Sequence, residues 1–154
     1  MRWAIALLAL GLASLPLAAV AQTSQTAQAV FAGGCFWCME PPYDKTPGVI
    51  STTSGYTGGE QVTANYRAIS SGGTGHYEVV RVEYDPAKVS YKRLLEIFWK
   101  NIDPFNAKGQ FCDTGDQYRA AVFYNNEEER LLAEQTKADA AGMTKSEEPI
   151  VTQI

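Results

Sequence analysis

The stretch AVFAGGCFWC, residues 29–38, combines a short apolar run with two glycines and two cysteines. The run at 29–32 predicts a buried strand, and Gly33-Gly34 predicts a tight turn at its end. A helix is expected to begin at Cys35. Because Pro41 and Pro42 lack the N–H group that a helix interior uses, this helix is expected to be short or kinked. The stretch therefore predicts a strand, a turn and a helix, with both cysteines after the turn.

Strand and helix patterns alternate along the rest of the chain. Strands are predicted at 49–56, 77–84 and 118–124 and from 149 to the end of the chain, helices after Ser90 and after Asn126 with a stop near Gly142, and a loop at 103–116. The alternation predicts a sheet with helices packed on it, an α+β or α/β sandwich.

The first 21 residues have the pattern of a secretory signal. Arg2 precedes an apolar run, and small residues surround Val20 just before Gln22. These features are the basic region, the apolar region and the cleavage site of an exported protein. We therefore expect a signal peptide at 1–21, a disordered leader at 22–28 and a single catalytic domain at 29–154, in a protein that is periplasmic or secreted.

The overall charge of the chain is mildly acidic, with 13 basic and 17 acidic residues and a net charge of −4. Its Lys and Arg residues form no cluster, so we expect no nucleic-acid partner and no membrane contact after signal cleavage. Three cysteines are an odd number for an exported domain. The count indicates either one disulfide with a leftover thiol or a redox-active set.

Cys35 and Cys38 carry the clearest chemical signal. A cysteine at the start of a helix lies beside unpaired N–H groups that stabilise a thiolate. Cys38 lies one helical turn further on the same face, so either sulfur can reach the other. This arrangement is typical of a redox or nucleophilic pair, although a structural disulfide and two buried thiols fit the same spacing.

The known uses of a CxxC motif differ in the other residues that they need. Haem attachment requires His after the second cysteine, and Met39 occupies that position. A zinc site would use Cys35, Cys38, His76 and Cys112. That ligand set is allowed, but its spacing matches no familiar zinc module. A thioredoxin-like dithiol exchanger is the stronger alternative, because its CxxC motif also lies between a strand and a helix.

An acidic residue lies on the apolar face of the predicted strand 77–84. Glu78 shares that face with two valines and a tyrosine. A carboxyl group buried without a counter-charge has a raised pKa and can donate a proton near neutrality. A strand-end carboxylate that reaches solvent is equally consistent with the pattern.

Two tyrosines are flanked by polar residues, Tyr66 and Tyr118. A phenol O–H suits hydrogen bonding to an oxygen in a partly apolar pocket, although a single half-buried tyrosine more often serves packing. His76 is the only histidine, and the pattern assigns it no role.

Taken together, these motifs resemble the type A peptide methionine sulfoxide reductases. The resemblance runs from about Val30 to the end of the chain and includes GCFWC at 34–38, GYTGG at 55–59, NYR at 65–67, GTGHYEVV at 73–80, YDP at 84–86, FWKNIDP at 98–104 and CDTGDQYR at 112–119. It implies an α+β fold, a two-layer sandwich with a ferredoxin-like βαβ core and a mixed sheet with helices packed on it. The chain stops at Ile154, before the family's usual end, so we expect a domain truncated at its C-terminus.

The resemblance also implies a role for each site residue. It makes Cys35 the nucleophile, Phe36 and Trp37 the walls that hold the substrate methyl group, Glu78 the acid, Tyr66 and Tyr118 the hydrogen-bond donors to the sulfoxide oxygen, and Asp113 a polar residue of the pocket. The implied activity is reduction of methionine-S-sulfoxide, free or in proteins, which repairs proteins damaged by oxidative stress. Attack by the Cys35 thiolate leaves that residue as sulfenic acid.

A second thiol and an external reductant are needed to regenerate the nucleophile. Many members of the family have Gly where this chain has Cys38, so Cys38 marks a CxxC-containing subgroup. We expect Cys38 to resolve the sulfenic acid as a disulfide because it is one turn from Cys35, with Cys112 as the alternative. A thioredoxin-like dithiol is the expected reductant. Neither a metal nor an organic cofactor is required, and the protein is expected to be a monomer.

Overall fold

The computed structural model describes residues 25–144 and 146–154, so the expected signal peptide at 1–21 lies outside the described residues. The first strand, β1 (Ala27–Gly33), begins two residues before the predicted boundary. Ala27 and Gln28 pair with Tyr84 and Glu83 of the neighbouring strand, so they belong to the sheet and not to a disordered leader. No helix within the described residues has both the length and the apolar character needed to cross a membrane.

Four strands form the main sheet, in the order β2-β3-β1-β6. The other three are β2 (Val49–Thr57), β3 (Tyr77–Tyr84) and β6 (Ala120–Phe123). Each strand is antiparallel to its neighbours. A parallel pairing occurs only as an isolated bridge between Ala121 and Gln153 in the described part of the chain, so the sheet is mixed through that bridge alone.

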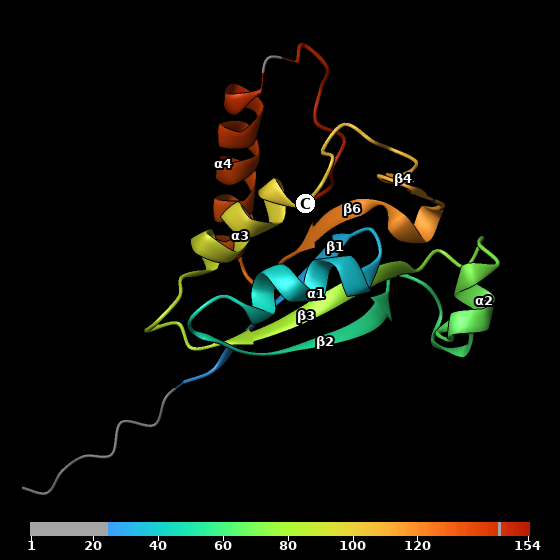
Figure 1. Ribbon diagram of the computed structural model, residues 1–154, viewed down its shortest axis with the longest axis horizontal. Coiled ribbons are helices and arrows are strands. Elements are labelled where there is room, and N and C mark those ends of the chain that lie inside the picture. The colour runs from blue at the N-terminus through green and yellow to red at the C-terminus, as the bar shows by residue number, and fades with distance from the viewer. Residues whose placement is uncertain (1–24, 145) are drawn as a thin grey trace, which may run out of the picture.

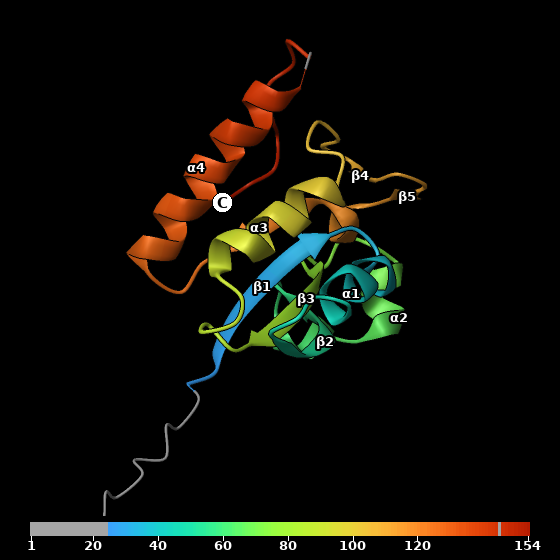
Figure 2. The same cartoon turned by 60° about the vertical axis from the view of Figure 1, so that its left-hand side comes forward.

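Two strand–helix–strand units interleave in this sheet. The helix α1 (Phe36–Asp44) joins β1 to β2, and α3 (Tyr91–Lys100) lies between β3 and β6. Because β3 lies between β1 and β2, each helix crosses over a strand of the other unit, which is the ferredoxin-like arrangement expected from the resemblance. A long helix, α4 (Glu127–Met143), packs beside α3 (Figure 1, Figure 2).

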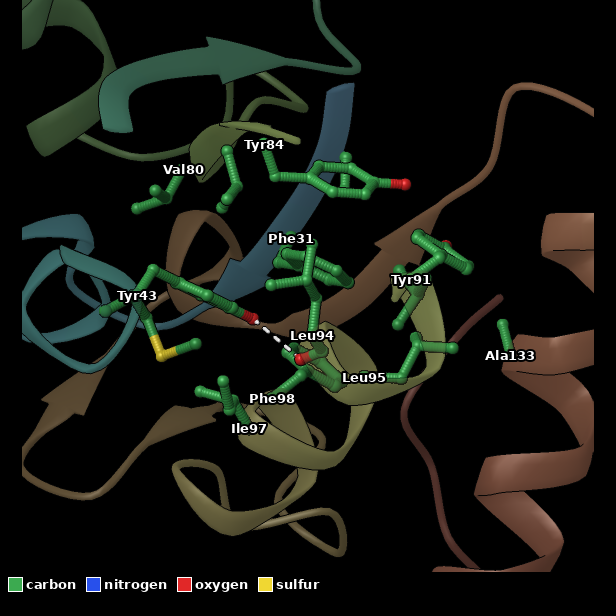
Figure 3. Close-up of a cluster of buried hydrophobic side chains, with 14 of the residues drawn as sticks. Phe31, Tyr43, Val80, Tyr84, Tyr91, Leu94, Leu95, Ile97, Phe98 and Ala133 are labelled. Atoms are coloured by element: carbon green, nitrogen blue, oxygen red, sulfur yellow. Dashed lines mark hydrogen bonds between the residues drawn. The ribbon is translucent and has the colours of Figure 1, made fainter. Parts of the chain in front are cut away.

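The main hydrophobic core lies between the sheet and the helices α1 and α3. Phe31 of β1 is fully buried at its centre, and its ring stacks on those of Tyr43, Tyr91 and Phe98 (Figure 3). The apolar stripe after Ser90 faces this core, as its helical spacing predicts. Tyr43 of α1 donates its hydroxyl to the Leu94 carbonyl at 3.5 Å, which links the two helices over the sheet.

The predicted helix caps are present. Ser90 accepts a hydrogen bond from the Arg93 N–H at 3.2 Å, and Asn126 accepts one from Glu129 at 2.9 Å. The helix after Asn126 runs one residue beyond the predicted stop at Gly142 and ends at Met143. The first helix is short, nine residues with both prolines inside it, as the sequence predicts.

Two predicted strands need correction. Tyr118 lies in a single 3-10 turn, η2 (Asp116–Tyr118), and the strand β6 begins only at Ala120. The Tyr118 N–H bonds to the Gly115 carbonyl and the Arg119 side chain bonds to the Asp116 carbonyl, which closes the turn. The segment 149–154 forms one bridge instead of a strand, because Val151 donates its N–H to Pro104 and not to the sheet.

The predicted loop at 103–116 contains a small hairpin. Its strands are β4 (Gly109–Gln110) and β5 (Asp113–Thr114), joined by Phe111 and Cys112. The buried Gln110 side chain fixes the hairpin to the preceding loop. Its amide oxygen accepts from the Asp103 N–H at 2.7 Å, and its amide nitrogen donates to the Asp103 carbonyl at 2.9 Å.

Candidate active site

The antiparallel sheet brings the predicted site residues to one end. At that end β1 and β2 finish, and β3 and β6 begin. Cys35 follows β1, Glu78 is the second residue of β3, and Tyr118 precedes β6. In both views the β1–α1 loop, the β4–β5 hairpin and the short helix α2 (Tyr66–Ser70) lie at this same end (Figure 1, Figure 2). The directions of the strands therefore bring residues that are far apart in the sequence to the same end of the sheet.

Two glycines set the position of Cys35. Gly34 has a φ of +90°, and a Cβ atom at that position would lie 2.6 Å from the Cβ of Gln110. A Cβ on Gly33 would lie 2.5 Å from the sulfur of Met39. Only glycine lets the chain turn here with the hairpin and α1 so close. Cys35 then becomes the N-cap residue of α1 and makes no side-chain capping hydrogen bond.

Cys38 lies in the first turn of α1 beside Cys35. Its N–H donates to the Cys35 carbonyl at 3.0 Å, and both cysteines are free thiols. Partial burial raises the pKa of the Cys38 thiol, and the neighbouring Cys35 raises it further through its charge and through a hydrogen bond. Cys38 therefore keeps its proton near neutral pH. No disulfide joins the two cysteines.

Glu78 is buried, with 3% of its surface exposed, so the structure decides between the two possibilities that the alternation in β3 left open. One carboxyl oxygen, Oε2, accepts a hydrogen bond from the Phe36 N–H at 3.2 Å. Burial raises the pKa of this carboxyl, the charge of Asp113 raises it further, and the hydrogen bond from Phe36 partly offsets the rise. The Glu78 carboxyl is thus hydrogen-bonded to the residue that directly follows Cys35.

The two tyrosines predicted to bind the sulfoxide oxygen lie on different elements around Glu78. Tyr66 opens α2 after its N-cap Asn65 and is 59% exposed, while Tyr118 in η2 is half-buried. Burial raises the pKa of Tyr118, and the charge of Glu78 adds to the rise. Asp113 and Tyr66 contribute in the same direction. Tyr118 is therefore close enough to each of these three groups for their charges to act on it.

Phe36 and Trp37 differ in exposure although they are adjacent. Phe36 is buried and Trp37 is 66% exposed, and their ring centroids lie 5.5 Å apart. If the two rings hold the substrate methyl group as the resemblance implies, Phe36 is the inner wall and Trp37 the outer one. A methyl group held between them would lie at the helix start, next to Cys35.

His76 has a structural role. It is buried, its Nδ1 atom accepts from the Gly59 N–H at 3.3 Å, and its Nε2 atom lies 3.0 Å from the Glu60 carbonyl. Both ring nitrogens are thus engaged by backbone groups of the loop after β2, which argues against the zinc alternative. Cys112 lies exposed at the tip of the β4–β5 hairpin, next to Asp113. Among the described residues no group of three or more His, Cys, Asp or Glu is arranged to hold a metal.

The structure adds a residue that the sequence did not single out. Tyr56 of β2 pairs in register with Glu78 of β3, and its ring lies 5.7 Å from that of Phe36. Its place in the glycine-rich GYTGG segment is the only signal in the sequence, and that signal names no partner. A separate cavity of about 420 Å³ lies between α3 and α4 and is lined by none of the predicted site residues.

Comparison with known proteins agrees with this geometry. Residues 27–154 match the family described as peptide methionine sulfoxide reductase. The peptide methionine sulfoxide reductase MsrA of Listeria innocua is 50% identical over 129 residues, which cover 82% of this chain and 72% of that protein. The one from Ligilactobacillus salivarius is 49% identical over 126 residues, again 82% of this chain, and 73% of that protein.

Solved structures of relatives share the fold. Methionine sulfoxide reductase A of Corynebacterium diphtheriae superimposes with a TM-score of 0.68 at 32% identity, over 85% of this chain and 64% of that chain. Reduced Mxr1 from Saccharomyces cerevisiae has a TM-score of 0.73 at 25% identity, over 86% of this chain and 77% of that chain. The chain therefore belongs to the type A peptide methionine sulfoxide reductases, enzymes that reduce methionine sulfoxide.

Proposed function

We propose that this enzyme reduces methionine-S-sulfoxide, free or in oxidised proteins, by attack of the Cys35 thiolate on the sulfoxide sulfur. The single observation that carries the proposal is the hydrogen bond between the Glu78 carboxyl and the Phe36 N–H. It holds a buried acid at the start of the helix that Cys35 caps. A sulfoxide oxygen leaves poorly unless it is protonated, so the nucleophile and a proton donor must act at the same point.

The proposed first step transfers two electrons. The Cys35 sulfur attacks the sulfoxide sulfur, Glu78 donates a proton to the oxygen, and the oxygen passes to Cys35. Methionine thioether leaves and Cys35 remains as sulfenic acid. Tyr66 and Tyr118 donate hydrogen bonds to the oxygen while negative charge develops on it. The cysteine sulfur loses two electrons, and the methionine sulfur gains them.

In the second step Cys38 attacks the sulfenic acid. A disulfide between Cys35 and Cys38 forms, and the hydroxyl group leaves as water after taking a proton. The two residues are in contact in the first turn of α1. An external dithiol then reduces the disulfide. Mxr1 from Saccharomyces cerevisiae has been solved in complex with Trx2, and we infer that a thioredoxin-like dithiol serves this chain, whose exposed Cys38 is open to attack.

The substrate is tested by an assay on each epimer separately. With dithiothreitol as reductant, the S-sulfoxide of N-acetylmethionine is expected to be reduced and the R-sulfoxide to be left unchanged. Equal turnover of both epimers would contradict the proposed stereochemistry. Reduction of protein disulfides with no sulfoxide reduction would instead support the dithiol-exchange alternative.

Cys38→Ser is expected to separate the two steps. A single turnover should release one equivalent of methionine and leave Cys35 as sulfenic acid, while turnover driven by thioredoxin falls by roughly 10²-fold or more, because the neighbouring thiol is lost. Stopped-flow kinetics and mass spectrometry with a sulfenic-acid reagent measure both effects.

Cys112→Ser is the matched control for this experiment, since Cys112 is also an exposed free thiol. Its turnover with thioredoxin is expected to equal that of the unmodified enzyme. The assignment of Cys38 is wrong if Cys112→Ser stalls at sulfenic acid and peptide mapping finds a bridge between Cys35 and Cys112.

A further inference from the structure

Tyr56 connects three parts of the site. It is aligned with Glu78 across the β2–β3 ladder, so both side chains project from the same face of the sheet. Its ring lies 5.7 Å from the Phe36 ring and 6.3 Å from the His76 ring, with the His76 contact edge-on. The inner edge of Tyr56 packs against the main core, and the residue as a whole is half-buried. Its ring therefore lies between the start of α1 and the turn that His76 clamps.

The Glu78 carboxyl has an oxygen free to accept a hydrogen bond from Tyr56. Oε2 accepts the Phe36 N–H, whereas Oε1 has no hydrogen bond to any group in the described part of the chain. Oε1 is also not one of the side-chain atoms in that part that are both fully buried and without a hydrogen-bond partner. It therefore faces the open space of the site. A carboxylate oxygen accepts more than one hydrogen bond. Tyr56 is the cross-strand neighbour of Glu78 on the same face of the sheet, although the two side chains are not hydrogen-bonded to each other in this structure.

We propose that Tyr56 is a positioning residue, which donates its hydroxyl to Oε1 of Glu78 and supports the Phe36 wall with its ring. The inference rests on the proposed role of Glu78 as the acid and adds a residue that sets its acidity. A hydrogen bond to the charged form of a carboxyl group favours that form. Tyr56 thereby counteracts burial and keeps the acidity of Glu78 close to the working pH, where a general acid is most effective.

The charges around Glu78 agree with this role. Glu78 interacts with Phe36 from α1, Asp113 from β5, Tyr118 from η2 and Tyr56 from β2. Burial raises the pKa of Tyr56, and the charges of Glu78, Tyr66 and Tyr118 raise it further, so the phenol remains protonated and available as a donor. The pKa of Glu78 is itself raised, first by burial and then by Asp113. The Phe36 N–H opposes that rise, and in the proposed arrangement the Tyr56 hydroxyl joins it.

The test is the titration of Glu78 in Tyr56→Phe, which keeps the ring and removes only the hydroxyl. The Glu78 carboxyl carbon is followed by NMR in uniformly ¹³C-labelled protein and identified by its loss in Glu78→Gln. The pKa of Glu78 is expected to rise by about one unit in Tyr56→Phe, because a hydrogen bond to its charged form is lost. The alkaline limb of the pH profile of kcat for sulfoxide reduction should move upward by the same amount.

Two further variants separate the ring from the hydroxyl. Tyr56→Leu removes both, so it should raise KM for the sulfoxide several-fold through loss of support for Phe36, while Tyr56→Phe leaves KM unchanged. Tyr124→Phe is the matched control, because Tyr124 is an exposed phenol just after β6. It should change neither the titration nor the kinetics. Circular dichroism confirms that each variant is folded.

The outcomes distinguish this inference from the proposed function. An unchanged or lowered pKa of Glu78 in Tyr56→Phe overturns the inference, whatever the activity. A large fall in kcat with no movement of the alkaline limb also overturns it and places the hydroxyl on the sulfoxide oxygen instead. If the enzyme reduces neither epimer, the proposed function fails, yet the NMR titration still decides whether Tyr56 binds Glu78.

Discussion

Cys35→Ser is expected to lower the rate of methionine sulfoxide reduction by roughly 10³-fold or more, since a serine hydroxyl is a far weaker nucleophile toward sulfur than a thiolate. The other two cysteines cannot replace it. Cys38 keeps its proton because burial and the Cys35 neighbour raise its pKa, and Cys112 lies on a separate hairpin. The initial rate with dithiothreitol and the S-sulfoxide measures the effect.

The structure provides an internal control for folding in this variant. Cys35 is the N-cap residue of α1 but makes no side-chain capping hydrogen bond. Serine is among the preferred N-cap residues, so Cys35→Ser should leave the melting temperature unchanged or raise it. Loss of activity with an intact melting temperature assigns the effect to the lost sulfur. Residual turnover above about a tenth of the original rate would mean that another cysteine attacks.

Glu78→Gln is expected to slow the sulfoxide step by roughly 10²–10⁴-fold, the usual range for a lost general acid. In the proposed mechanism the protonated form of Glu78 is the active one. The rate of the original enzyme is expected to fall as pH increases through the pKa of Glu78. Because that pKa is raised, the fall should occur at a higher pH than for an ordinary glutamate. The rate of the Glu78→Gln variant should not show this fall with pH. Single-turnover rates between pH 5 and 9 measure both effects.

The same raised pKa also makes the stability of the fold decrease as pH increases. A carboxyl whose pKa is higher in the folded state stabilises the fold below its unfolded pKa and loses that contribution as pH increases through the folded value. Glu78→Gln should therefore not lower the melting temperature at pH 7, because no buried charge forms. Glu83→Gln is the control, since Glu83 lies on the opposite face of β3. An equal loss of rate in Glu83→Gln would remove the case for Glu78 as the acid.

Local patterns predicted the elements that carry the site. The run before Gly33-Gly34 predicted β1, and the period-two alternation in 77–84 predicted β3 and placed Glu78 on its apolar face. The hydroxyl and amide side chains of Ser90 and Asn126 predicted two helix starts. Each of these signals comes from residues that are close together in the sequence. The interactions that cause them are therefore local and can be read from the sequence alone.

Longer-range pairings could not be predicted in the same way. The segment 118–124 has the composition of a strand throughout, yet Tyr118 lies in the turn η2 because Arg119 and Gly115 close it. The segment 149–154 also has a strand composition, but Val151 bonds to Pro104 in a loop about fifty residues earlier. The first case is a short-range turn that competes with the strand, and only the second depends on a contact with a distant segment.

The sequence by itself determined the family, and it predicted Cys35 as the nucleophile, Cys38 as its neighbour and Glu78 as an acid on the apolar face of a strand. Only the tertiary structure decided which groups meet that acid. The register of β2 against β3 places Tyr56 opposite Glu78, and the turn before α1 aims the Phe36 N–H at its carboxyl. Register depends on how two distant segments pack their apolar faces, and a shift of one residue would send Tyr56 to the other face of the sheet. The environment that sets the acidity of Glu78 is for that reason a property of the assembled sheet.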